Sequence, residues 1–199
     1  MALLFMDGFD GFTTVAQAGR RGINALNLDV KTTGGRFGGG AIQGMGGVGS
    51  INVPFTSISG DTVYLGWAQR QSNMSATMIW SLGRGSASRI QGATSNACMY
   101  LMIDTGGSST VSVRNAAGAQ IATFTLPFDG AWHWFDLKVV ALSGTSGSFE
   151  LRMDGNTVAS ATGVNMAGSS ATGTQWSWNF GYSYAYQGDT SPYFDDLVI

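Results

Sequence analysis

The amino-acid sequence predicts an all-β protein built as a two-sheet antiparallel sandwich. Three observations lead to this expectation. Apolar and polar residues alternate with a period of two in most segments, turn residues separate these segments at short intervals, and no stretch of ten or more residues shows a helical period. A chain of 199 residues suits one such sandwich, and we expect a single domain over residues 1–199.

The alternating segments follow one another along the whole chain. Their apolar positions are Leu26, Leu28 and Val30; Val63, Leu65 and Trp67; Met99, Leu101 and Ile103; Val111 and Val113; and Ile121 to Leu126. Residues 34–49 are rich in glycine and residues 164–174 are small and polar, so both segments are expected to be long loops. Residues 1–10 and 193–199 are candidate partner strands.

Two tight turns are predicted from their residue types. Residues 115–118 read Asn-Ala-Ala-Gly and would reverse the chain between two strands. Asp154 and Gly155 would join residues 148–153 to residues 157–161 in a two-residue hairpin, because both central residues of such a turn need a positive φ. These turns support antiparallel pairing of the segments they join.

Composition narrows the classes of partner. Charged residues make up 11% of the chain, far below the typical value of about 25%, which favours a surface packed against neighbours in an assembly. Ten basic residues and a net charge of -2 give no electrostatic footprint for nucleic acid. No apolar run approaches the length of about 20 residues that spans a bilayer, so we expect no membrane partner.

One stretch resembles a known family. Residues 128–139 read Phe-Asp-Gly-Ala-Trp-His-Trp-Phe-Asp-Leu-Lys-Val and resemble a strand of laminin-G-like and concanavalin A-like domains. The same resemblance covers residues 151–155 (Leu-Arg-Met-Asp-Gly), residues 195–199 (Asp-Asp-Leu-Val-Ile) and the opening residues 5–10. It implies a jelly-roll sandwich over most of the chain, and residues 11–60 match only loosely. Short, glycine-rich jelly rolls of this kind also resemble structural proteins of tailed bacteriophages.

The inventory of ionisable residues argues against an enzyme. Glycoside hydrolysis needs two carboxyl groups that flank the scissile bond, whereas Glu150 is the single glutamate. Asp195 and Asp196 are adjacent on an expected strand and should point to opposite faces. His133 is the only histidine, and Asp136 should face away from it on the same strand. The family resemblance implies a structural role for His133. We therefore expect no catalytic residues.

A metal site is a weaker expectation. Laminin-G-like domains, which this chain resembles, often hold Ca²⁺ through aspartate carboxylates and backbone carbonyls. Candidate ligands would converge if the two terminal strands pair: Asp7, Asp10, Asp195 and Asp196. Alternatively, Asp195 only forms a hydrogen bond to a loop. We expect no other cofactor.

The most unusual feature is a run of aromatic residues at every second position. Its members are Trp176, Trp178, Phe180, Tyr182, Tyr184 and Tyr186. On one strand all six rings would share a face, and the tryptophan and phenylalanine part is expected to belong to the core. Tyr182, Tyr184 and Tyr186 would emerge as a binding surface for a protein or a sugar, because exposed tyrosines are enriched at interfaces.

Two functions are expected from these observations. The first is a non-enzymatic bacteriophage virion protein, a capsid, neck or tail decoration or adhesion component that contacts other virion proteins and itself in a symmetric assembly. It would be assembled in the host cytoplasm and reside in the virion. The alternative is a lectin-like carbohydrate-binding module that recognises a host-surface glycan.

Overall fold

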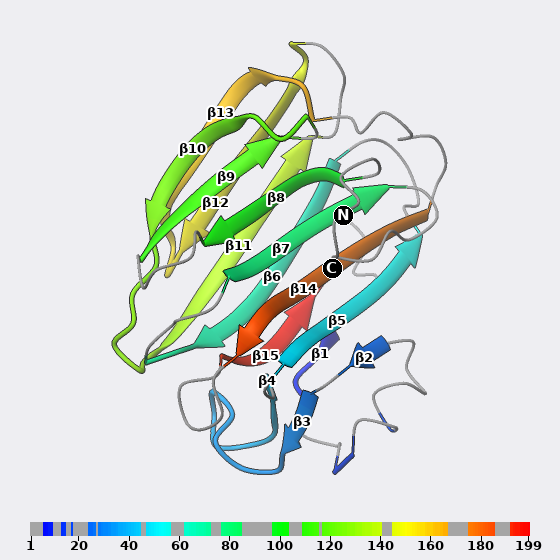
Figure 1. Ribbon diagram of the computed structural model, residues 1–199, viewed down its shortest axis with the longest axis vertical. Helices are drawn as coiled ribbons and strands as arrows, with labels where there is room; N and C mark the ends of the chain where they lie inside the picture. The colour runs from blue at the N-terminus through cyan, green and yellow to red at the C-terminus, as the bar shows by residue number, and fades with distance from the viewer. Residues whose placement is uncertain are drawn as a thin grey trace.

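The computed structural model confirms the all-β sandwich, with two antiparallel sheets facing each other (Figure 1). The structure describes residues 6–9, 13–14, 17, 24–26, 28–44, 47–56, 62–72, 77–84, 97–103, 109–115, 117–140, 145–166, 175–185 and 192–199. No helix in this part of the chain is long and apolar enough to cross a membrane.

The larger sheet, sheet A, has the strand order β13-β12-β11-β6-β15-β4-β3. The short strand β1 belongs to the same sheet and also pairs with β15. Its strands are β1 (Met6–Asp7), β3 (Leu28–Lys31), β4 (Ala41–Gly44), β6 (Thr62–Arg70), β11 (Trp132–Val140), β12 (Gly147–Met153), β13 (Asn156–Val164) and β15 (Tyr193–Val198). The last strand of the chain therefore lies between β6 and β4, far from both in sequence (Figure 1).

The second sheet, sheet B, has the order β10-β9-β8-β7-β14-β5-β2. Its strands are β2 (Asn24–Leu26), β5 (Gly47–Thr56), β7 (Thr77–Arg84), β8 (Ala97–Ile103), β9 (Thr110–Asn115), β10 (Gln120–Thr125) and β14 (Gln175–Ala185). The aromatic-rich strand β14 is central in this sheet and pairs with β5 and β7.

The core lies between the sheets, where the alternating apolar residues of both inner faces meet. Trp67 of β6 is 1% exposed and stacks on Phe135 of β11, with ring centroids 5.0 Å apart. Its indole also meets Trp178 of β14 edge to face at 5.4 Å. This contact joins the two sheets and confirms the core expectation for Trp178. The alternation in β6 and β11 thus defines an inner face and an outer face of sheet A.

Several local predictions are confirmed. Asp154 and Gly155 both have positive φ, 51° and 81°, and join β12 to β13. Gly118 has φ 84° and closes the turn between β9 and β10, where the Asn115 side chain accepts hydrogen bonds from the amides of Ala117 and Ala119. The terminal strands pair as expected, with Asp7 opposite Leu197.

Two segments differ from prediction. Residues 34–49 are not one long loop, because β4 occupies Ala41–Gly44 and β5 begins at Gly47. Glycine-rich composition conceals these strands, although Ala41 and Ile42 of β4 are fully buried in the core. The alternating segment around Leu26, Leu28 and Val30 is likewise divided: β2 belongs to sheet B and β3 to sheet A.

Candidate functional site

The outer face of sheet A carries a group of aromatic side chains around β11. Phe135, Leu137 and Val139 point into the core and are buried, as the sequence pattern indicates. The alternate residues Trp132 and Trp134 therefore point outward and are partly exposed. Together with Tyr193 and Phe37 they form what we call the outer aromatic face.

Three neighbouring strands bring Trp132, Arg70 and Tyr193 into one row. In the register of sheet A, Arg70 of β6 lies directly opposite Trp132 of β11 on one side and opposite Tyr193 of β15 on the other. The guanidinium carbon of Arg70 is 5.2 Å from the centroid of Trp132 and 4.4 Å from that of Tyr193. Each contact is within the range of a cation–π interaction, so the two rings hold the arginine between them.

Trp134 lies against the sheet because β6 has a glycine beneath it. A Cβ atom on Gly66 would be 2.7 Å from Cζ2 of Trp134, closer than carbon atoms approach. The indole Nε1 donates a hydrogen bond of 2.8 Å to Oδ1 of Asp136, two residues along the same strand. The guanidinium carbon of Arg36 is 5.2 Å from the Trp134 centroid. The ring is thus fixed on three sides, between a glycine, a carboxylate and a cation.

Arg36 and Phe37 belong to the loop between β3 and β4, which Asp195 holds in place. Oδ2 of Asp195 accepts a hydrogen bond of 2.8 Å from the backbone amide of Arg36, and Asp195 is 3% exposed. A Cβ atom on Gly35 would be 2.8 Å from the same oxygen, so the loop backbone approaches the carboxylate closely. This anchored loop presents Phe37, whose side chain is 82% exposed and contacts Arg36 at 5.0 Å.

The expectation that Asp195 and Asp196 point to opposite faces is wrong. Nη1 of Arg36 lies 3.8 Å from Oδ2 of Asp196, while Asp195 accepts the backbone amide of the same arginine. Asp196 has φ 49°, and the pairing of β15 with β6 shifts register between Asp195 and Val198. This bulge breaks the strict alternation and turns both carboxylates toward one loop.

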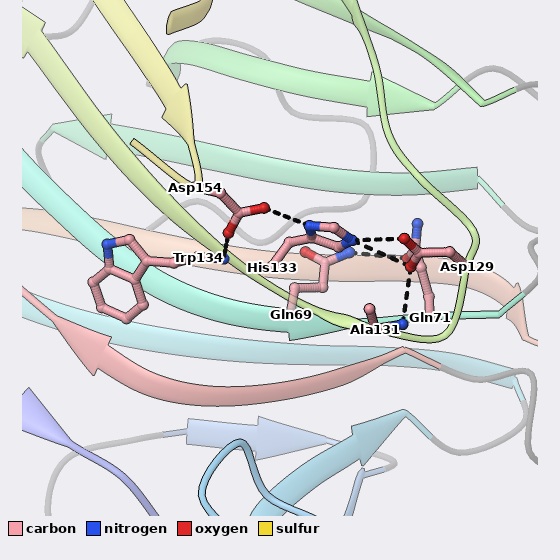
Figure 2. A network of polar contacts seen from close by, with 7 residues as sticks. All are labelled: Gln69, Gln71, Asp129, Ala131, His133, Trp134 and Asp154. Carbon is pink, nitrogen blue, oxygen red and sulfur yellow. Dashed lines mark hydrogen bonds and ion pairs between the residues drawn. The ribbon is translucent and has the colours of Figure 1, made fainter. Parts of the chain in front are cut away.

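His133 occupies the inner side of β11 at the end of the sandwich, between two carboxylates (Figure 2). Its Nδ1 is 2.6 Å from Oδ2 of Asp154, and its Nε2 is 3.2 Å from both carboxylate oxygens of Asp129. Because a carboxylate only accepts, both ring nitrogens donate when the ring carries its second proton. Asp136, the partner considered from the sequence, is bonded to Trp134 instead.

These contacts shift the pKa values of His133, Asp129 and Asp154. Burial of the ring lowers the pKa of His133, but the hydrogen bonds that the ring donates to Asp154 and Asp129 outweigh it and leave the pKa above its ordinary 6.5. The Ala131 amide and His133 lower the pKa of Asp129. Burial raises the pKa of Asp154, yet His133 and the Trp134 amide outweigh this and lower it overall. The cluster is therefore an ion-pair network that connects β11 to two turns.

A chain of side-chain amides runs beside this cluster (Figure 2). The Trp67 indole donates to Oε1 of Gln69 at 3.2 Å, and Nε2 of Gln69 donates to Oε1 of Gln71 at 2.9 Å. Indole nitrogen can only donate, so it fixes the orientation of both amides. Gln71, 3% exposed, ends this row of amides, and its Nε2 has no hydrogen-bond partner among the residues that the structure describes.

The predicted site residues are described only in part. Tyr182 and Tyr184 belong to β14, but their side chains lie outside what the structure describes, and Tyr186 lies outside the described residues altogether. Their role stays a prediction. Of the predicted calcium ligands, Asp195 forms the hydrogen bond to a loop that was the alternative. Asp10 and the side chain of Asp7 lie outside the described residues. In the described part of the chain, no group of three acidic, histidine or cysteine side chains could hold a metal ion.

Sequence reasoning missed the row formed by Trp132, Arg70 and Tyr193, as well as the partners of His133. Trp132 and Tyr193 are 61 positions apart, and only the register of β6 with both neighbouring strands brings them together. A partial signal existed for His133: Asp129 precedes it by four residues, and Asp154 occupies the predicted hairpin turn between β12 and β13, where its amide donates a hydrogen bond to the Trp134 carbonyl of β11.

Comparisons with known proteins identify the fold. No family model matches the chain, and no curated protein matches its sequence. Among solved structures, the potassium-bound Emp46p carbohydrate recognition domain is 13% identical with a TM-score of 0.66, and the alignment covers 98% of this chain and 94% of that one. An endo-beta-1,4-glucuronan lyase from the fungus Trichoderma reesei is 12% identical with a TM-score of 0.61, covering 99% and 94%.

Lectin I-B4 from Griffonia simplicifolia is a further similar structure, with 10% identity, a TM-score of 0.58 and 98% of both chains covered. Because these identities are low, the comparison establishes the fold and leaves function open. Similar structures include carbohydrate-recognition domains and polysaccharide lyases alike. The chain has the concanavalin A-like, lectin-type jelly-roll fold.

Proposed function

We propose that this protein is a non-catalytic glycan-binding protein that holds sugar rings against the outer aromatic face. The observation that carries the proposal is the outer aromatic face as a whole, where Trp132, Trp134 and Tyr193 lie beside the guanidinium groups of Arg36 and Arg70. Sugars bind through their apolar C–H faces and their hydroxyl groups, so a site needs an aromatic ring beside fixed donors and acceptors. Trp134 supplies the ring, Asp136 an acceptor and Arg36 a set of donors.

The fold supports this proposal, since similar structures bear the names of carbohydrate recognition domains and a lectin. Lyases share the fold too, so the choice between binding and cleavage depends on the residues. A histidine that acts as a base needs a free ring nitrogen. Both nitrogens of His133 are within hydrogen-bonding distance of carboxylates, and the raised pKa favours the protonated form, which cannot accept a proton. Binding without catalysis fits this arrangement better.

The test is a glycan array probed with the wild-type protein and with Trp134→Ala. We expect the wild type to bind a defined set of glycans and Trp134→Ala to lose them while it remains folded. Tyr64→Ala is the matched control, because Tyr64 is an exposed aromatic residue of the same sheet, four positions along β6 from the Ala68 that pairs with Trp134.

The array also separates the competing sites. Loss of binding in Tyr184→Ala or Tyr186→Ala, but not in Trp134→Ala, would transfer the site to the predicted tyrosine run. An array on which the wild-type protein binds nothing would refute a glycan-binding function. Equal losses in Trp134→Ala and Tyr64→Ala would show a nonspecific effect of removing apolar surface.

A second candidate is a structural component of an assembly such as a bacteriophage virion. The specific observation that favours it is Phe37, 82% exposed on a loop that Asp195 anchors, in a chain with only 11% charged residues. Exposed aromatic anchors on rigid supports contribute strongly to protein interfaces. Analytical ultracentrifugation should then show concentration-dependent association that Phe37→Ser abolishes. A strictly monomeric protein at high concentration would contradict this candidate.

A further inference from the structure

We propose that Arg70 is a carboxylate-binding residue and that the glycan bound at the outer aromatic face carries uronic acid. The inference rests on the proposed glycan-binding function and adds the chemical class of the ligand. It starts from the position of Arg70, whose guanidinium lies between the rings of Trp132 and Tyr193 on the outer side of sheet A.

The two rings determine which part of the guanidinium a ligand can reach. Ring contacts at 5.2 and 4.4 Å occupy the surroundings of its central carbon, so a ligand approaches the N–H groups at its edge. Guanidinium N–H groups form a planar fork that matches the two oxygens of a carboxylate. Clamping the side chain in advance reduces the rotamer entropy that binding would otherwise cost.

Arg70 has no acidic partner in the described part of the chain. Among these residues, no carboxylate lies within ion-pairing distance of its guanidinium, which contacts the rings of Trp132 and Tyr193. Asp195, the buried carboxylate of the neighbouring strand, accepts hydrogen bonds from the amides of Arg36 and Asp196. By contrast, Arg152 on the same sheet is paired with Glu150 at 2.8 Å.

The loop between β3 and β4 passes beside the guanidinium. Gly34 has φ +92° and no side chain, and a Cβ placed on it would be only 3.8 Å from Nη2 of Arg70. The loop therefore passes along the arginine without covering it with a side chain. Arg36, two residues further on, contacts the Trp134 ring, so a second cation lies next to the proposed sugar platform.

A uronic acid has one group for each part of this surface: C–H groups for the aromatic rings and a carboxylate for Arg70. A pyranose ring stacks on an aromatic ring through its C–H groups, and the carboxylate on the same ring reaches the arginine fork. The net charge of the chain is -2, so long-range attraction of polyanions is weak and selectivity has to arise from this local geometry. A 1,4-linked oligouronate is therefore the appropriate probe.

The experiment compares three probes by isothermal titration calorimetry. They are a 1,4-linked hexauronate, the same hexamer after reduction of its carboxyl groups to alcohols, and an O-sulfated neutral hexamer. We expect the wild-type protein to bind the hexauronate at least about tenfold more tightly than the reduced hexamer, equivalent to about 1.4 kcal/mol. Arg70→Gln should reduce affinity for the hexauronate to that for the reduced hexamer.

Two further variants make the result specific. Arg70→Lys keeps the charge but loses the planar fork, so it should recover only part of the affinity for the hexauronate. Arg152→Gln removes the same charge from the same sheet and should leave the preference unchanged, because Arg152 is already paired with Glu150. Urea unfolding of each variant establishes that it is folded before its affinity is compared.

The outcomes distinguish the carboxylate assignment of Arg70 from the glycan-binding function on which it rests. Equal affinity for the native and reduced hexamers, or a preference that survives in Arg70→Gln, overturns the carboxylate assignment and leaves glycan binding intact. A stronger affinity for the sulfated hexamer also overturns it, in favour of a sulfate site. Failure to bind any glycan, neutral ones on the array included, overturns the proposed function and this inference together.

Discussion

His133 couples three segments of sheet A through charge, and its replacement by glutamine tests that coupling. Its two nitrogens contact Asp154, in the turn after β12, and Asp129, in the turn before β11. The side chain is 17% exposed, and the two carboxylates are 46% and 52% exposed. Since His133 is the only histidine of the chain, a stability change between about pH 6 and pH 8 has one principal source.

The sign follows from the direction of the pKa shift. The pKa of His133 is raised above its ordinary 6.5, so the folded state binds a proton more tightly than the unfolded state. The resulting stabilisation is fully present below pH 6.5 and is lost as the pH rises through the folded-state pKa. Asp129 and Asp154 have lowered pKa values, so their contribution is lost as the pH falls below their ordinary value of 3.8.

The expected size is modest because the two carboxylates are partly exposed. Ion pairs of this kind contribute about 0.2–1 kcal/mol each, so two of them give about 0.4–2 kcal/mol. For a domain of this length, each kcal/mol changes Tm by about 2–4 °C. The Tm of the wild type minus the Tm of His133→Gln should therefore fall by about 1–8 °C between pH 6 and pH 8.5.

The assay is urea and thermal unfolding followed by tryptophan fluorescence at half-unit pH steps. Asp154→Asn is a useful second variant, since asparagine tolerates the positive φ of 51° and can accept the Trp134 amide but carries no charge. It should show a smaller pH dependence than wild type. A wild-type protein that gains stability over His133→Gln as the pH rises from 6 to 8 would refute the reasoning.

Three further substitutions test packing and the site. Trp67→Ala removes a ring that is 1% exposed and packed on Phe135 and Trp178, so urea unfolding should show a loss of about 3–5 kcal/mol. Asp195→Ala leaves the Arg36 amide without its acceptor; hydrogen exchange at that amide should accelerate, with a destabilisation of about 1–3 kcal/mol. Gly66→Ala places a Cβ 2.7 Å from Cζ2 of Trp134, so tryptophan fluorescence should change and glycan affinity should fall while the protein stays folded. An unchanged fluorescence spectrum and affinity in Gly66→Ala would contradict the described position of the ring.

Local sequence patterns account for the features of the fold that depend on near neighbours. Alternation along β6 and β11 identifies Trp67 and Leu137 as core residues, and both are buried. The Asp154–Gly155 turn is equally local, because two adjacent residues determine it. Such patterns state which face of a strand is apolar, but they do not state which strand lies beside it.

The candidate site depends on the pairing of distant strands, and that is why it was not predicted. Arg70 acquires its two rings from β11 and from the last strand of the chain. The bulge at Asp196 turns the two adjacent carboxylates toward the same loop, whereas strict alternation would point them to opposite faces of the sheet. A hydrogen bond between Asp195 and a loop was one of the expected alternatives, but its partner Arg36 is 159 positions away, and only tertiary structure identifies it.

Hydrogen–deuterium exchange with and without a saturating 1,4-linked hexauronate tests the location of glycan binding most directly. Bound ligand should protect residues 132–136 of β11 and residues 34–37 of the loop that Asp195 anchors; Trp134→Ala should abolish that protection, and Arg70→Gln should need more ligand to reach it. Protection confined to residues 175–185 of β14, with none over β11 and the loop, would contradict the assignment of the site to the outer aromatic face.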